Sequence, residues 1–68
     1  MNFMLVYEWI NENTGYRYEE EVNFFDTKEE LFEAKKWAEE DFKWQIKVGR
    51  LILHAGVRYD WDEIKDYF

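Results

Sequence analysis

The sequence predicts an α+β fold, namely a three-stranded antiparallel sheet formed in the order ββαβ, with one long helix packed on one face and a short C-terminal helix. Three observations predict it. Apolar side chains alternate with a period of two over residues 3–10 and again over residues 50–59, and they recur at helical spacing over residues 27–47. Residues 1–68 are expected to form a single domain, because no proline-rich or glycine-rich linker divides this short chain.

The first 25 residues predict a β-hairpin. Strands at residues 3–10 and 16–25 flank a segment rich in turn-forming residues, in which Gly15 supplies the left-handed conformation that closes the loop. The first strand is apolar on most of both faces, as a central strand should be, whereas the second is acidic and suits an edge. The expected sheet order is therefore 2-1-3, with the third strand reached by a right-handed crossover.

A regular ladder in which Trp9 faces Tyr18 gives the hairpin one coherent apolar face. The ladder then pairs Tyr7 with Glu20, Leu5 with Val22, and Phe3 with Phe24. It leaves Glu20 as the one charged residue on the apolar face, at the sheet edge or beside an arginine.

Thr27 and Glu30 form a T-x-x-E capping box, which predicts a helix that runs to about Lys47. Its apolar stripe consists of Leu31, Ala34, Ala38, Phe42 and Ile46. Gly49 is placed to end the helix in a left-handed conformation.

Residues 50–59 alternate as a third strand, although a break at residues 54–56 would instead make them a second hairpin. Asp60 and Glu63 resemble an acidic version of the capping box. They predict the short C-terminal helix, which would cover the outer sheet face through Trp61, Ile64 and Phe68.

Neither a nucleophile–base pair for covalent catalysis nor a set of zinc ligands can be assembled from the sequence. There is no cysteine and no serine, the two threonines suit a turn and a helix cap, and His54 is the only histidine. The acidic cluster at residues 60–66 lacks the glycine and the spacing of a calcium-binding loop. We therefore expect a protein that is not an enzyme and that has neither a cofactor nor a metal site.

The net charge is −7, and five of these charges lie in the first 26 residues. Such acidity repels nucleic-acid phosphates and anionic lipids, so direct binding to nucleic acid or membrane is disfavoured. The expected partner is a basic protein surface, such as that of a nucleic-acid-handling protein. No apolar run approaches the roughly 20 residues that span a bilayer, and we expect a cytoplasmic protein, in the host cytoplasm if phage-encoded.

Two surfaces are candidates for partner binding. In the first, Glu19 and Glu21 project from one face of the second strand, about 6.6 Å apart, with Glu8 alongside and Glu12 at the hairpin tip. This carboxylate ladder could imitate part of a phosphate row. The alternative is a solvated edge whose charges prevent aggregation.

In the second candidate surface, Trp37 and Trp44 point away from the apolar stripe of the helix, among acidic residues that include Glu33 and Glu40. Exposed tryptophans surrounded by acids suit a partner that presents lysine or arginine. Alternatively, the rings fold over a corner of the core or meet their copies in a dimer.

The favoured hypothesis from the sequence is a small acidic inhibitor or adaptor, a nucleic-acid mimic that occupies a basic surface of its partner. Small acidic single-domain proteins of this kind are common among phage-encoded anti-defence and host-takeover factors, including anti-CRISPR proteins. The alternative is a small structural domain that forms a homodimer through its outward aromatic residues.

Overall fold

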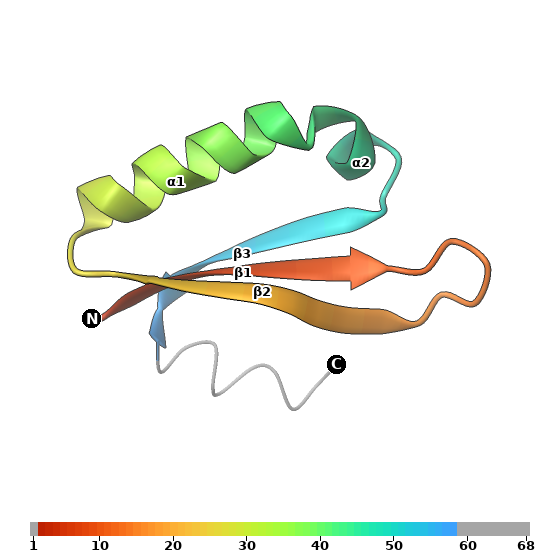
Figure 1. Cartoon of the computed structure of the whole chain (residues 1–68), viewed down its shortest axis with the longest axis horizontal. Coiled ribbons are helices and arrows are strands. Elements are labelled where there is room, and N and C mark those ends of the chain that lie inside the picture. The colour runs from red at the N-terminus through yellow and green to blue at the C-terminus, as the bar shows by residue number, and fades with distance from the viewer. Residues whose placement is uncertain (1, 59–68) are drawn as a thin grey trace.

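The computed structural model describes residues 2–58, and the predicted C-terminal helix and the acidic cluster at residues 60–66 lie outside this range. The elements are β1 (Phe3–Ile10), β2 (Arg17–Phe25), α1 (Lys28–Asp41), α2 (Lys43–Lys47) and β3 (Leu51–Val57). The sheet order is β2-β1-β3, and both outer strands run antiparallel to β1. The two helices form a layer over one face of this sheet (Figure 1). The predicted α+β fold and its strand order are confirmed.

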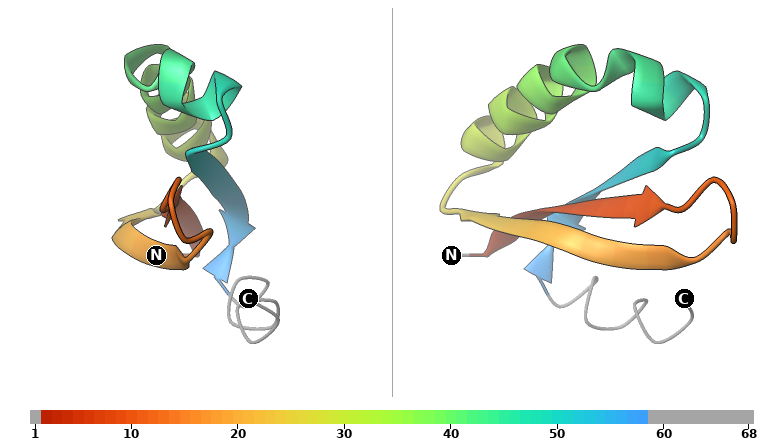
Figure 2. Two further views of the ribbon diagram at one scale, coloured as in Figure 1. Left: turned by 90° about the vertical axis from the view of Figure 1, so that its right-hand side faces the viewer. Right: turned by 45° about the vertical axis from the view of Figure 1, so that its right-hand side comes forward.

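The helical segment carries the chain from one edge of the sheet to the other. It begins beside the end of β2, passes over the sheet and returns into β3 on the far side of β1 (Figure 2). As a result β1 has a strand on each side. The crossover therefore gives the most apolar strand of the chain the most protected place in the fold.

A β-bulge interrupts the hairpin, and the predicted regular ladder is wrong beyond it. Trp9 faces Tyr18 as expected, but Tyr7 faces Glu21, with the register shift between Tyr7 and Glu8. Glu20 is the extra residue on β2 and is exposed. The bulge thus removes a carboxylate from the apolar face on which a regular ladder would place it.

The shifted register exchanges the faces of β2 on the side of the bulge nearer α1. Opposing residues of a ladder share a face, so Val22 and Phe24 lie on the outer face beside Val6 and Met4. Phe25 lies on the helix face opposite Phe3. The predicted pairs of Leu5 with Val22 and of Phe3 with Phe24 are corrected accordingly.

The core lies between β1 and the helix. Leu5, Leu31 and Ala38 are buried together. The partly buried side chains packed against them are Phe3, Tyr7, Phe25, Ala34 and Leu53. On the opposite face of the sheet, Met4 and Val6 form a second buried cluster. The central strand is therefore buried on both faces.

The predicted continuous helix is instead divided at Phe42. The Thr27 side chain caps α1 as expected, accepting a hydrogen bond from the Glu30 backbone N–H at 3.2 Å. At Phe42 the backbone leaves helical geometry, with φ of −115° and ψ of 29°. Its ring packs edge-on against Tyr7 and Trp9, with centroids 5.9 and 5.4 Å away. Packing against the strand aromatics accompanies the change of direction between α1 and α2 (Figure 1).

The chain enters β3 through Gly49, whose φ of 76° is in the left-handed region that the sequence predicts for it. Residues 51–57 then form one continuous strand. The alternative of a second hairpin broken at residues 54–56 is therefore wrong.

Two glycine substitutions test this description of the turn and strand. Gly49→Ala should lower the free energy of unfolding by about 1–2 kcal/mol, because alanine is strained at positive φ. Gly56 has ordinary strand geometry and no atom within 4 Å of an added Cβ. Gly56→Ala, the matched control, should leave stability unchanged or raise it by up to about 1 kcal/mol. Urea denaturation of both variants checks this, and equal losses would contradict it.

Candidate protein-interaction surface

Glu8, one of the predicted binding residues, is buried and cannot contact a partner. Only 2% of its surface is exposed. Its Oε1 lies 3.3 Å from Nε2 of His54 and 3.8 Å from Nη1 of Arg17. The predicted exposure of Glu8 is therefore wrong. The sheet carries His54 and Arg17 on the same outer face of β3 and β2, and they supply partners for a carboxylate removed from water.

The bulge also separates Glu19 from Glu21. Glu19 faces Glu8 on the outer face, whereas Glu21 faces Tyr7 on the helix face. Both side chains are exposed, as expected, but they do not form a ladder on one face. Because of the inserted residue, Glu8, Glu19 and Glu21 do not form the row that the sequence predicts.

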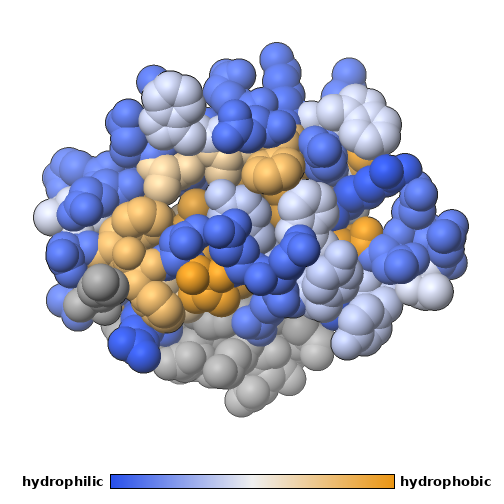
Figure 3. All heavy atoms as spheres, in the orientation of Figure 1, coloured by the Kyte–Doolittle hydropathy of each residue, from blue (hydrophilic) through white to orange (hydrophobic). Residues whose placement is uncertain are grey.

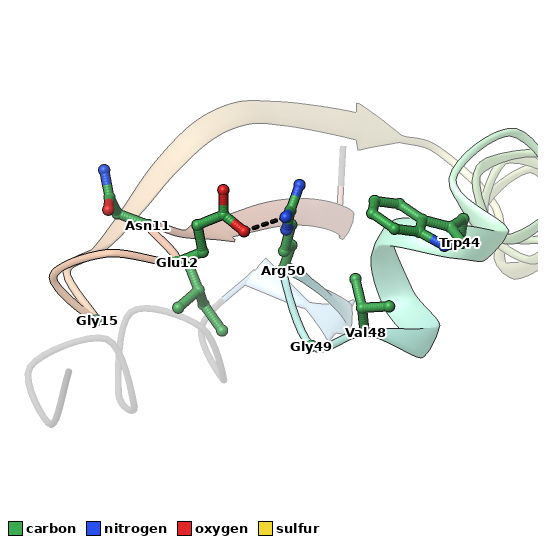
Figure 4. A pocket seen from close by; sticks show the side chains of 8 residues that line it. Asn11, Glu12, Gly15, Trp44, Val48, Gly49 and Arg50 are labelled. Carbon is green, nitrogen blue, oxygen red and sulfur yellow. Dashed lines mark hydrogen bonds and ion pairs between the residues drawn. The ribbon is translucent and has the colours of Figure 1, made fainter.

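Glu12 is the carboxylate at the tip of the hairpin, and it pairs with an arginine of the chain itself. Nη2 of Arg50 donates a hydrogen bond to its Oε2. The two residues line a shallow cleft of about 410 Å³ between the hairpin loop and the α2–β3 turn (Figure 4). Glu12 is therefore partly neutralised and ties the hairpin loop to the start of β3.

The same arginine reaches Trp44. The guanidinium carbon of Arg50 lies 5.0 Å from the centre of the Trp44 ring, which is 57% exposed. Figure 4 shows Arg50 between Glu12 and Trp44, which project into the cleft from opposite sides. Arg50 thus supports the exposed ring from one side and leaves its remaining surface available for a partner.

Trp37 is exposed, as the sequence predicts, and its surroundings on the helix are acidic. It is 62% exposed, and its indole N–H donates to Oε1 of Glu33 at 3.2 Å. Three and four residues further along the helix lie Glu40 and Asp41, both exposed. The charged residues one helical turn from Trp37 are therefore all carboxylates. The hydrogen bond holds the ring against the helix, which lowers the entropy that binding would cost.

Tyr7 of β1 has acidic residues of both the sheet and the helix in its surroundings. Burial, together with the nearby carboxylates of Glu21 and Asp41, raises the pKa of Tyr7 above its ordinary value of 10.0. Glu21 belongs to β2 and Asp41 to α1. In the direction shown in Figure 3, hydrophilic side chains cover the helix layer above a hydrophobic cluster.

The structure thus defines an acidic tryptophan flank, which consists of Glu21, Glu33, Trp37, Glu40, Asp41 and Trp44. Five of these six residues were predicted to bind a partner, and the sequence also places Asp41 among the acids around the two tryptophans. The bulge brings Glu21 to this side of the molecule, because it turns Glu21 towards the helix. Glu19 is exposed on the opposite face of the sheet, and Glu8 and Glu12 have internal partners.

Replacing the buried carboxylate should destabilise the fold. Glu8→Ala is expected to lower the free energy of unfolding by about 2–3 kcal/mol, because it removes the charged partner of His54 and Arg17 from a buried site. The exposed residue opposite, Glu19, provides the control, and Glu19→Ala should change stability by less than about 0.5 kcal/mol. Denaturation in urea measures both variants. A similar small effect of both would show that Glu8 is not structural.

Titration of Tyr7 tests where Glu21 points. Glu21→Gln and Asp41→Asn should each lower the pKa of Tyr7 towards 10.0, because each removes a negative charge that opposes ionisation. Glu20→Gln, at the bulge, is the control and should have a smaller effect. Tyrosine ring-carbon NMR resolves the titration. An unchanged pKa in Glu21→Gln would favour the regular ladder.

The raised pKa of Tyr7 also sets the sign of a stability change in alkali. Because the folded protein holds this proton more tightly than the unfolded chain, stability is lost as the pH rises from about 10 through the folded pKa. The loss should be smaller in Glu21→Gln.

Among residues 2–58, no group of three potential metal ligands gathers and no helix is long and apolar enough to cross a membrane. Comparison of the chain with protein families, characterised proteins and solved structures found no match. What the exposed residues can bind must therefore be inferred from their own geometry and charge.

Proposed function

We propose that this chain is a non-enzymatic protein-binding module, an inhibitor or adaptor, that places its acidic tryptophan flank against a basic surface of another protein. The observation that carries the proposal is the exposure of Trp37 and Trp44 on a helix flank whose charged neighbours around Trp37 are all carboxylates. A large aromatic ring is costly to leave in water, and tryptophan is enriched among residues that dominate binding energy.

The chemistry of the flank favours arginine or lysine on the partner. A guanidinium or ammonium group can lie over an indole ring while a neighbouring carboxylate accepts its N–H groups. The chain already makes such a contact internally, where Arg50 lies over Trp44 and pairs with Glu12. Trp37 and Glu33 are held together at 3.2 Å and would offer the same combination to a foreign cation.

A basic partner suits the chain as a whole, because its net charge of −7 accelerates encounter with positive surfaces and repels nucleic acid and anionic lipid. Proteins that handle nucleic acids present such surfaces in their binding grooves, and we propose a protein of this class as the partner. The carboxylates that would occupy the groove are those of the acidic tryptophan flank, which includes Glu21. The outer-face ladder that includes Glu8 is not part of the proposal.

Affinity capture with the folded chain as bait tests the proposal. Basic proteins should be retained at low salt and released as the ionic strength rises, because exposed charges are screened. A Glu33→Lys, Glu40→Lys bait should lose them. The charge control is Glu39→Lys, because Glu39 pairs with Lys35 away from the tryptophans. If the amount of protein retained changed with neither the salt concentration nor the charge reversals, the electrostatic basis of the proposal would be contradicted.

The contribution of the tryptophans should be visible in the affinity for any captured partner. Trp37→Ala is expected to weaken binding by at least about 30-fold, the loss typical of a hot-spot residue. Phe32→Ala is a matched control, because Phe32 is an aromatic residue of the same helix that is 60% exposed but lies outside the flank. It should change affinity by less than about threefold. Titration calorimetry measures both, and equal losses would place the binding surface elsewhere.

A further inference from the structure

Among residues 2–58, the two edges of the sheet differ in how they are protected, and the edge formed by β3 is the less protected one. Edge strands are commonly shielded by charges and bulges that prevent pairing with other chains. β2 has both, since Glu19, Glu20 and Glu21 follow one another at its bulge. β3, in contrast, has the sequence LILHAGV, with no aspartate, glutamate, lysine or arginine.

The hydrogen-bond pattern shows which backbone groups of β3 face outward. The N–H of Ile10 donates to the carbonyl of Arg50 at 2.9 Å, and that of Arg58 donates to the carbonyl of Asn2 at 3.1 Å. Bonded and non-bonded pairs alternate in an antiparallel ladder, so the even-numbered residues of β3 bond to β1. The odd-numbered residues direct their N–H and C=O groups away from β1.

Leu53 and Ala55 are the middle two of these odd-numbered residues. Ala55 is exposed, although it lies within a strand. Within residues 2–58 the sheet ends at β3, so no strand of the described chain lies opposite these backbone groups. They offer a short pairing edge with a small side chain at its exposed point.

A groove of about 550 Å³ runs beside this edge, and its rim has charges of both signs. Ile46, Leu51 and Leu53 contribute apolar lining. Lys35 and Glu39 also line the groove, and Nζ of Lys35 lies 3.7 Å from Oε1 of Glu39. Arg17 is the third charged lining residue and pairs with the buried Glu8. A two-fold axis would bring Lys35 of one copy towards Glu39 of the other, so this pair is complementary in charge to its own copy.

We propose that β3 pairs antiparallel with β3 of a second copy of this chain, about a two-fold axis near Leu53. The two sheets then become one six-stranded sheet, with the helices of both copies on the same face. Leu53 lies opposite its own copy, Lys35 of each protomer meets Glu39 of the other, and the acidic β2 strands remain at the two outer edges.

This dimer does not require the acidic tryptophan flank. β3 and β2 are opposite edges of the sheet, so Glu21, the β2 member of the flank, lies away from the proposed interface. The proposed interface contains neither Trp37 nor Glu33, which carry the proposed binding of a basic partner. The proposed dimer also differs from a dimer held by Trp37 and Trp44, and variants separate the two arrangements.

Amide hydrogen exchange followed by NMR gives a direct test. Between about 10 μM and about 1 mM, the range in which small interfaces associate, the amides of Leu53 and Ala55 should become protected as the concentration rises. Those of Ile52 and His54 should be protected throughout, because they face β1. Sedimentation over the same range should show a monomer–dimer equilibrium. A monomer at about 1 mM with unchanged exchange would overturn the proposal.

Matched proline variants locate the interface. The N–H of Ala55 faces away from β1, so Ala55→Pro should keep the monomer folded while preventing strand pairing. Val22→Pro is the control on β2, because Val22 is paired with Val6, whose backbone bonds to β3 instead. Ala55→Pro should be monomeric, whereas Val22→Pro should dimerise as the wild type does. Circular dichroism verifies the fold of each variant. A dimer that survives Ala55→Pro would overturn the proposal.

Charge reversal provides a test that does not alter the strand. Lys35→Glu should weaken the dimer at least threefold, because it sets two acids against each other across the axis. Combining Lys35→Glu with Glu39→Lys should restore the affinity. If the double variant is as weak as the single one, or if Trp37→Ala dissociates the dimer instead, the β3 arrangement is wrong.

Discussion

Because β1 is buried on both faces, the outer strands and the helix layer are arranged around it. Leu5 and Val6 are adjacent in sequence, point to opposite sides of the sheet, and are both fully buried. A chain of 68 residues has little surface to remove from water. A strand that makes apolar contacts on both of its faces therefore lets this short chain form a core. The crossover helix and the order β2-β1-β3 follow, because both put neighbours around that strand.

The bulge at Glu20 determines on which face of the sheet the acidic residues of β2 lie. One extra residue assigns Val22 and Phe24 to the outer face and turns Glu21 towards Tyr7. Glu8 remains on the outer face and is buried with His54 and Arg17 as partners. Of the hairpin carboxylates predicted to bind a partner, Glu21 therefore lies on the side of the helix layer, where Trp37 and Trp44 are also exposed, whereas Glu19 is exposed on the opposite face. The proposed binding function depends on this coincidence of charge and aromatic surface.

Local contacts hold the exposed aromatic residues in defined positions, which connects stability to function. Arg50 contacts both Glu12 and Trp44, so it links the hairpin loop, α2 and the start of β3. Glu33 fixes the indole of Trp37 through a hydrogen bond. Preorganised side chains lose less entropy on binding. Two restrained tryptophans therefore suit the proposed binding of a partner at a surface without a deep pocket.

Local periodicity, capping and turn chemistry are enough to predict the order of the elements, the cap at Thr27, the left-handed Gly49 and the exposure of Trp37 and Trp44. The bulge, the break at Phe42 and the burial of Glu8 are visible only in the folded chain. These features arise from contacts between residues far apart in the chain, such as Phe42 with Tyr7 and Glu8 with His54. A period-two pattern cannot reveal an inserted residue, because the energy that favours the insertion comes from the opposing strand and the helix.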